Sequence, residues 1–289
     1  MKLERSRHQW YPQNLARLEA MLEHAKPGQY AVVDWDNTSI FRDIQDVVLD
    51  HQCEKMAFRI APDALAETLL DGLPEQAFAP DCRNLDGERV RAAQLAADLE
   101  ADYRWAHENP ALVRQSHPRM LAFRARLRFF YHALDRHLGH ILSCTWITRL
   151  YAGMTAPQVH RLTHDAILAA SHRAIARARW EMPEGCAGES GRVAVTWSQG
   201  ARALVAMQEL YGALEARGVN VHVVSASFGE IVREFASNEA HGYHLSADRV
   251  HGMQLERGAD GRFTHRMRED VSHTQAEGKT RTIEAEIKP

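Results

Sequence analysis

Two short apolar runs constrain the fold of this 289-residue chain more than any other feature. Residues 30–34 (YAVVD) and 219–227 (VNVHVVSAS) are both rich in β-branched side chains, and the first shows no alternation with polar residues. Such runs are typical of strands covered on both faces of a parallel sheet. Parallel strands need long crossover connections, usually helical. The sequence therefore predicts an α/β fold.

The connections between these runs fall into two patterns. Residues 43–188 show helical periodicity, as in 118–140 and 155–180, and almost no strand-like segment. After residue 188 strand and helix alternate: a possible strand at 193–197, a helix from Ser198 as N-cap to Gly218, the second run, and a helix at 228–237. A hairpin turning at Asp260-Gly261 and a helix beginning near Lys279 complete the pattern. We expect a discontinuous core of residues 1–42 and 189–289, interrupted by a helical domain of 43–188.

Composition excludes several classes of protein. The net charge is −3 and charged residues make up 25% of the chain, so we expect no nucleic-acid partner. No apolar stretch approaches the ~18 residues of a spanning helix, and the charged N-terminal segment differs from a signal peptide. We expect a cytoplasmic protein without a membrane partner. The four cysteines (Cys53, Cys82, Cys144 and Cys186) form no CxxC pair, which predicts reduced and mostly buried thiols.

Polar side chains stand where both apolar runs end. Asp34 and Asp36 follow the first run, and Ser225 lies at the end of the second. Ligands of open parallel sheets bind beyond the carboxyl ends of the strands. One carboxylate can attack phosphorus, the other can move a proton, Ser225 can donate to a phosphoryl oxygen, and Lys279 can neutralise charge at a helix N-terminus. Two aspartates taken by themselves would also fit an exposed loop. The order of the aspartates, Ser225, the hairpin and Lys279 along the chain favours a catalytic site.

These residues resemble the motifs of haloacid dehalogenase-like hydrolases. Residues 34–41 (DWDNTSIF) resemble the first motif, with Asp34 matching the nucleophile and Asp36 the acid/base; Ser225 matches the second motif and Lys279 the third. The resemblance implies a Rossmann-like three-layer α/β/α core with a large all-helical cap. It also implies Mg²⁺ held by Asp34 and the main-chain carbonyl of Asp36, with a small phosphomonoester as substrate. The phosphate would lie against Asn37, Thr38, Ser225, Ala226 and Lys279.

The large insertion and residues 246–263 resemble the phosphoserine phosphatase-like branch, and particularly phosphorylcholine phosphatase-like proteins. That branch suggests a quaternary ammonium headgroup, which an aromatic wall can bind by cation–π attraction. Trp35 and Phe41 are the predicted aromatic contacts, and Asp46 and Glu54 the predicted anionic ones.

The family's fourth motif, an acidic GDxxxD-type loop that completes the Mg²⁺ site, is absent. Ten residues follow Lys279, and Glu284 and Glu286 would lie on the helix that begins there. We expect weakened Mg²⁺ binding, a core incomplete at its C-terminus, and an open edge beside residues 30–33 that a partner or second copy could cover. A truncated product is favoured over an evolved pseudoenzyme. The alternative function is a non-catalytic phosphate-binding or interaction protein, or a truncated pseudo-phosphatase.

Two further patterns have competing interpretations. His160 and His164 are four residues apart on a predicted helix, a spacing that can share a metal ion. The glutamate of HExxH is missing, which favours a solvated helix face. Arg119, Arg124, Arg126 and Arg128 could meet an anionic substrate, but such runs are also typical of solvated faces.

Overall fold

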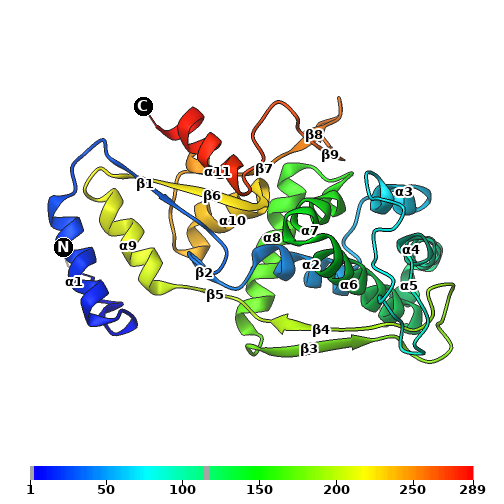
Figure 1. The fold of residues 1–289 in the computed structure, drawn as a ribbon. Coiled ribbons are helices and arrows are strands. Elements are labelled where there is room, and N and C mark those ends of the chain that lie inside the picture. The colour runs from blue at the N-terminus through cyan, green and yellow to red at the C-terminus, as the bar shows by residue number, and fades with distance from the viewer. Residues whose placement is uncertain (1–2, 114–116, 289) are drawn as a thin grey trace.

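A three-stranded parallel sheet forms the centre of the fold in the computed structural model, which describes residues 3–113 and 117–288. The strands are β1 (Tyr30–Val33), β6 (Asn220–Phe228) and β7 (Val250–Met253), in the order β1-β6-β7 (Figure 1). Tyr30 pairs with Asn220 and Val33 with Val223, so β1 and β6 run to the same edge. The two apolar runs of the sequence are therefore neighbouring strands.

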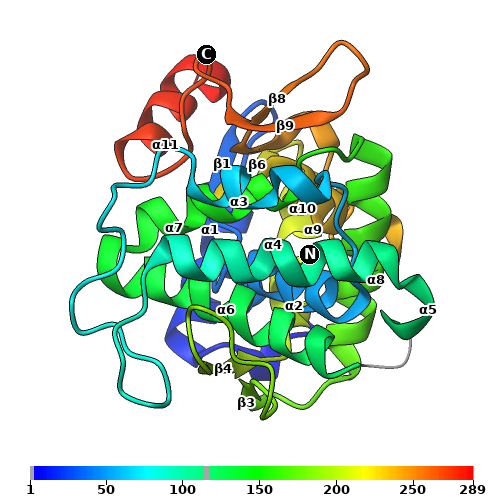
Figure 2. The same ribbon diagram turned by 90° about the vertical axis from the view of Figure 1, so that its right-hand side faces the viewer.

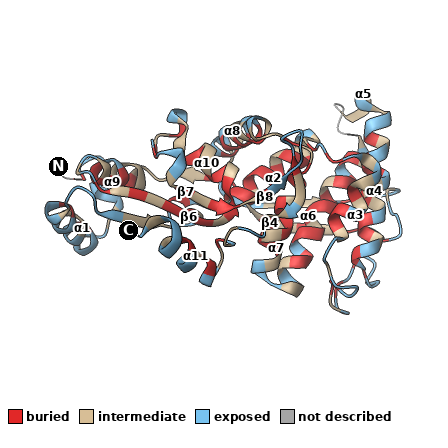
Figure 3. Ribbon diagram, turned by 90° about the horizontal axis from the view of Figure 1, so that it is seen from above, coloured by how far each residue is buried: buried red, intermediate tan, exposed pale blue. Residues whose placement is uncertain are grey.

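Helices from both ends of the chain cover this sheet. They are α1 (Pro12–His24), α9 (Val205–Glu215), α10 (Gly229–Ser237) and α11 (Glu277–Thr282), the last continuing into a π-helical turn at Ile283–Ile287. One hydrophobic cluster joins Leu22 of α1, Tyr211 of α9, Val221 of β6 and Phe235 of α10. Burial is concentrated along β6 and on the inner faces of the helices (Figure 3). The predicted α/β class with a Rossmann-like parallel sheet is confirmed.

The prediction that residues 30–33 are covered on both faces is wrong. Tyr30 is exposed and the other three residues of β1 are half-buried. Within the described chain β1 pairs with β6 alone, which leaves it at the sheet edge. β6 is the covered strand, because it has neighbours on both sides and helices packed against it.

The second half of the molecule is mainly helical. It contains α2 (Ile44–Lys55), α3 (Leu65–Leu70), α4 (Ala92–Glu108), α5 (Pro110–Val113), α6 (Pro118–Leu138), α7 (His140–Ile147) and α8 (Ala156–His172). Figure 2 looks onto this half, where α4 packs beside α6. A separate hydrophobic cluster fills it except at α8, whose buried apolar residues belong to the sheet's cluster. α2 supplies Val48 to the sheet's cluster and Leu49 to the helical one, so it connects both cores. Single 3₁₀ turns occur at Arg7–Gln9, Pro62–Ala64, Thr148–Tyr151, Glu239–His241 and Ala247–Arg249.

Three antiparallel pairs lie outside the parallel sheet. β8 (Leu255–Arg257) and β9 (Phe263–Met267) form the predicted hairpin around Gly261, whose φ of 76° requires the freedom of glycine. β2 (Ile40–Phe41) pairs with β5 (Arg202–Ala203), and β3 (Ala176–Glu181) with β4 (Ala194–Gln199). β3 adds a strand within 43–188, where helix was expected; the division at 43 and 188 itself stays a prediction.

Two local expectations about β4 are wrong. β4 does not join the parallel sheet, and Ser198 lies within this strand rather than capping a helix, since α9 begins at Val205. Trp197 of β4 packs against Trp180 of β3, with ring centroids 4.6 Å apart. The alternation of residues 176–180 was the signal for this hairpin.

The arginine run on α6 lies largely inside the helical half. Arg128 pairs with Asp46 at 2.9 Å and Asp50 at 3.3 Å, and its guanidinium group lies 4.9 Å from the centroid of the Trp197 ring. Arg126 pairs with Asp102 and with Asp98. Both arginines are buried, so the solvated-face interpretation is wrong for them.

Cys53, Cys82 and Cys144 are buried, Cys186 is half-buried, and all four are free, as predicted. None of the described helices combines the length and apolar character that a membrane span requires.

Replacing Arg128 by alanine should destabilise the protein by about 3–5 kcal/mol, because Asp50 would remain buried, and Asp46 partly so, without their cation. Arg136→Ala is the control on the same helix: Arg136 is mostly exposed and its pair with Asp81 spans 3.5 Å, so the change should cost less than about 1 kcal/mol. Urea unfolding of the three proteins measures both values. Equal losses would contradict the assigned role of Arg128.

Candidate active site

The shared edge of β1 and β6 brings the predicted motifs together. Asp34 follows β1 directly, Ser225 lies in β6, and Lys279 comes from the first turn of α11. The Lys279 Nζ donates to Asp34 Oδ2 at 2.6 Å, and Ser225 Oγ donates to Asp36 Oδ2 at 3.4 Å. Residues from three distant parts of the sequence thus form one polar cluster, as the motif order predicts.

Asp34 presents its carboxylate to solvent. Its side chain is 46% exposed, while that of its partner Lys279 is 28% exposed. The Asp34 Oδ1 accepts from the main-chain N–H of Trp35 at 2.8 Å, and the main-chain oxygen of Asp34 accepts from Ser39 Oγ at 2.5 Å. The main chain is therefore held in place while the carboxylate stays reachable, with the Lys279 ammonium group beside it.

Asp36 has the opposite environment. Its Oδ1 accepts from the main-chain N–H of Ile44 at 2.8 Å, and its Oδ2 accepts from Ser227 Oγ at 2.7 Å. Burial, helped by the negative charge of Asp34, raises the pKa of Asp36 to about 6. Asp36 can thus hold or release a proton near neutral pH, which is the property that acid/base chemistry needs.

The loop after Asp34 is a tight turn. The main-chain N–H groups of Thr38, Ser39 and Ile40 all donate to the carbonyl of Trp35, and Asn37 has a φ of 54°. The side chains of Asn37 and Thr38 are exposed beside Asp34 in sequence, and Ala226 is half-buried between Ser225 and Ser227. Their role as phosphate contacts stays a prediction.

Three polar residues of the cluster were missed in the sequence. Ser227 binds Asp36, and it faces the same side of β6 as Ser225 because side chains alternate along a strand. Thr274 Oγ1 donates to the main-chain oxygen of Ser225 at 2.5 Å, a contact that no local pattern indicates. Asp43 caps α2 through the N–H of Gln45 at 2.7 Å. Burial and the charge of Asp36 raise the pKa of Asp43 well above its usual value.

The structure contradicts the predicted substrate role of Trp35. Its side chain is completely buried and packs against Phe235 and Tyr243, with ring centroids 5.5 and 4.9 Å away. The indole lies in the hydrophobic core, while the carboxylate before it is exposed. Trp35 therefore anchors the loop and cannot form an aromatic wall for a ligand.

The other predicted substrate contacts are dispersed. Phe41 is a surface residue of β2, with the Arg42 guanidinium 5.0 Å from its ring centroid. Asp46 lies in the first turn of α2 but is paired with Arg128. Glu54 is paired with Arg173 and lies about 15 Å farther along α2 than Ile44. Asp46 and Glu54 are thus each paired with an arginine, and the substrate role of Phe41, Asp46 and Glu54 stays a prediction.

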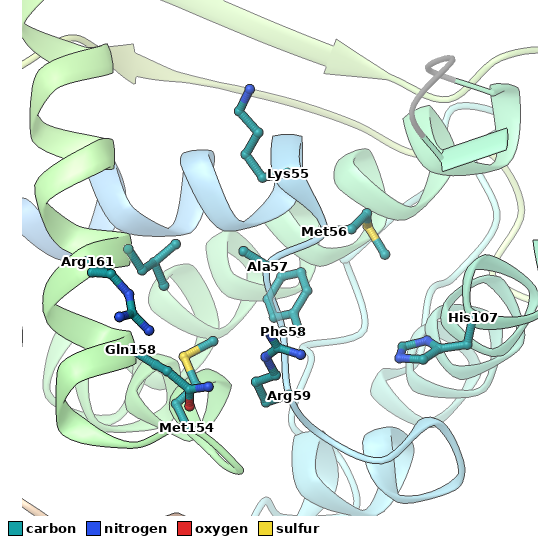
Figure 4. A pocket seen from close by; sticks show the side chains of 10 residues that line it. Lys55, Met56, Ala57, Phe58, Arg59, His107, Met154, Gln158 and Arg161 are labelled. Atoms are coloured by element: carbon teal, nitrogen blue, oxygen red, sulfur yellow. The ribbon is translucent and has the colours of Figure 1, made fainter. Parts of the chain in front are cut away.

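Of two cavities, one lies next to the cluster and the other lies away from it. One of about 670 Å³ lies beside Lys279, lined by Ile141 of α7, residues 269–273 and 275–278, and Arg281. The other, of about 460 Å³, lies at the far end of α2 between α4 and α8 (Figure 4). Its lining carries Lys55, Arg59 and Arg161 and, among described residues, no acidic side chain. Neither cavity is lined by Asp34 or Asp36. The first one adjoins the cluster because residues next to Lys279 in the sequence line it.

The cluster fits a magnesium ion only in part. Mg²⁺ prefers oxygen ligands and keeps several waters. The Asp34 carboxylate and the main-chain carbonyl of Asp36 have suitable chemistry, whereas the Asp36 carboxylate is occupied by hydrogen bonds from Ile44 and Ser227. Across residues 3–113 and 117–288, no third acidic or histidine side chain joins these two in a ligand group. The described chain thus offers two oxygen ligands, with water and substrate oxygens to complete the coordination.

Replacing Asp36 by asparagine should raise stability at high pH. The folded-state pKa of Asp36 is raised from 3.8 to about 6, so ionisation penalises the folded state above pH 6 and not below pH 3.8. Asparagine preserves the shape and cannot ionise. The gain should reach at most about 3 kcal/mol at pH 8 and vanish near pH 4.

Urea unfolding across this pH range measures the difference. Asp63→Asn, at an exposed position in the Pro62–Ala64 turn, is the matched control. An Asp36→Asn protein no more stable than the parent at pH 8 would contradict the raised pKa.

Comparison with known proteins gives a family and a shared fold. The family model for haloacid dehalogenase-like hydrolases matches residues 144–288, half of the chain, which include Ser225 and Lys279 but not Asp34. A crystal structure of a conserved functionally unknown protein from Anaerococcus prevotii DSM 20548 is 23% identical, with a TM-score of 0.88 over 97% of this chain and 78% of that one. It shows a shared fold. A search of curated proteins finds no match. The chain belongs to the haloacid dehalogenase-like hydrolases.

Proposed function

We propose that this protein is a phosphoric monoester hydrolase that forms a phospho-aspartyl intermediate at Asp34. One observation carries the proposal: an exposed carboxylate bound by Lys279 at 2.6 Å stands two residues before an enclosed carboxyl group whose pKa is raised to about 6. The first has the accessibility of a nucleophile, and the second can hold or release a proton near neutral pH. Membership of the hydrolase family supports the same class of reaction.

The residues divide the reaction into two steps. An Asp34 carboxylate oxygen attacks phosphorus, the bond from phosphorus to the ester oxygen breaks, and the Asp36 proton passes to the departing alkoxide. Asp36, now ionised, takes a proton from water; the hydroxide oxygen bonds to phosphorus and the acyl phosphate bond breaks, releasing phosphate and restoring Asp34. Lys279 stabilises negative charge on the transferring group. When bound, Mg²⁺ would supply further positive charge beside Asp34.

The substrate of this proposal is a small phosphomonoester. Trp35 is buried and Glu54 is paired with Arg173, so the structure offers no support for a quaternary ammonium site built from the predicted residues. The phosphoserine phosphatase-like or phosphorylcholine phosphatase-like branch stays a prediction from sequence.

A second candidate is a phosphate-binding protein without turnover. It is favoured by the observation that Asp34 and Asp36 have no third metal-ligating side chain among the described residues. With few protein ligands, Mg²⁺ binds weakly and compensates little charge at phosphorus. Isothermal titration with Mg²⁺ and with inorganic phosphate separates the candidates: phosphate binding without Mg²⁺ binding and without turnover supports the second one.

Replacing Asp34 and replacing Asp36 should reduce the rate of hydrolysis to different extents. Asp34→Asn should abolish turnover of both aryl and alkyl phosphates in the presence of Mg²⁺, because no carboxylate remains to attack phosphorus. Asp36→Asn should slow alkyl phosphates by about 10²–10⁴-fold and aryl phosphates less, because a phenolate leaves with little help from an acid. Steady-state kinetics at pH 6 measures both, with Asp63→Asn as the control.

The intermediate itself can be trapped. Borohydride reduces an aspartyl phosphate to homoserine, which peptide mass spectrometry should locate at position 34 after quenching the reaction. Hydrolysis that survives in Asp34→Asn, or homoserine at another position, would overturn the assignment of the nucleophile.

A further inference from the structure

A cluster of two histidines and one glutamate lies away from the active site, between α8 and α10. His164 comes from α8, Glu234 from α10, and His241 from the 3₁₀ turn that follows α10. The His164 Nδ1 lies 3.3 Å from His241 Nε2 and 3.7 Å from Glu234 Oε1, and His241 Nε2 lies 3.9 Å from that same oxygen. Figures 1 and 3 show α8 packed beside α10.

We propose that His164, Glu234 and His241 bind one divalent transition-metal ion of the Zn²⁺ type. Zinc takes imidazole nitrogens and carboxylate oxygens at 2.0–2.2 Å in tetrahedral geometry, which places the ligand atoms about 3.4 Å from one another. The three separations in the cluster, 3.3, 3.7 and 3.9 Å, require shifts of no more than about 0.5 Å to match. Two nitrogens and one oxygen also suit zinc better than magnesium, which prefers oxygen alone.

The ligand atoms are held in position before any ion binds. Asn238 Nδ2 donates to Glu234 Oε1 at 2.6 Å, and this hydrogen bond between residues four apart in the sequence fixes the Glu234 carboxylate. The His241 side chain is only 3% exposed and its ring packs on Phe235, with centroids 5.1 Å apart. Gln208 Nε2 donates to the main-chain oxygen of His241 at 2.8 Å. Such supporting contacts are typical of metal ligands.

The fourth coordination position faces solvent. A cavity of about 330 Å³ adjoins the cluster, lined by His160, Arg161, His164, Asp165, Glu234 and Asn238. His160, the other histidine of the HRLTH segment, donates from Nε2 to Glu230 Oε2 at 2.8 Å and stands outside the ligand set. Water or an exchangeable small ligand would complete the coordination. The bound ion would add a further link between α8 and α10, which already pack together.

The test is zinc binding by the full chain in an Asp34→Asn background, which removes the active-site carboxylate. Isothermal titration should give one Zn²⁺ per chain, and the melting temperature should rise with Zn²⁺ concentration, because the ion binds the folded state more tightly than the unfolded chain. His164→Gln and Glu234→Gln should each weaken binding about tenfold or more. His172→Gln, at an exposed position two turns farther along α8, should leave affinity unchanged.

Cobalt provides an independent readout, since Co²⁺ in a four-coordinate site absorbs visible light strongly. The bands should appear in the Asp34→Asn protein and vanish in Asp34→Asn/His164→Gln, whose far-ultraviolet circular dichroism verifies that it is folded. Absence of Zn²⁺ binding, or equal binding with and without His164, would show that the cluster is only a hydrogen-bonded group and overturn the proposal.

Discussion

The carboxyl group of Asp36 is the point on which the rest of the site depends. Through its two oxygens it joins the end of β6, by way of Ser225 and Ser227, to the first main-chain N–H of α2 at Ile44. β1, β6 and the helical half therefore meet at one enclosed acid. Such an acid destabilises the folded state when ionised, and the surrounding hydroxyl and N–H donors offset part of that cost. The same burial raises the pKa of Asp36 to about 6, which lets this group hold a proton near neutral pH.

Much of this arrangement could be predicted because the strands and their ends have local signals. Two β-branched runs followed by Asp34 and Ser225 place those residues at a shared sheet edge, and a Gly-Lys step at a helix start places Lys279 there. The exposure of β1 could not be read from its composition, because it depends on how many strands pair with it. The β3–β4 hairpin was missed for a different reason: alanine and arginine are strong helix formers, and their alternation was the weaker signal.

Long-range partners account for the remaining errors. Trp35 was expected to face a ligand because it stands between two polar residues, yet its side chain packs in the core against Phe235 and Tyr243. Arg128 was expected in solvent, but Asp46 and Asp50 of another helix neutralise it. His164 had one spaced partner in sequence, His160, whereas its actual neighbours are Glu234 and His241. Side-chain pairs between distant elements leave no local pattern.

The position of Lys279 is linked to the helical half as well as to the sheet. The segment before α11 is fixed at Thr274, which donates to Ser225, and at Gln275, whose Nε2 donates to the main-chain oxygen of Ile141 at 3.1 Å. Thr145 of α7 also donates to Gln275 Oε1 at 3.3 Å. Because Ile141 and Thr145 belong to α7, any displacement of that helix changes the anchor of the segment that carries Lys279. The helical half is thus linked to Asp34 through Lys279, and to Asp36 through α2 and Ile44.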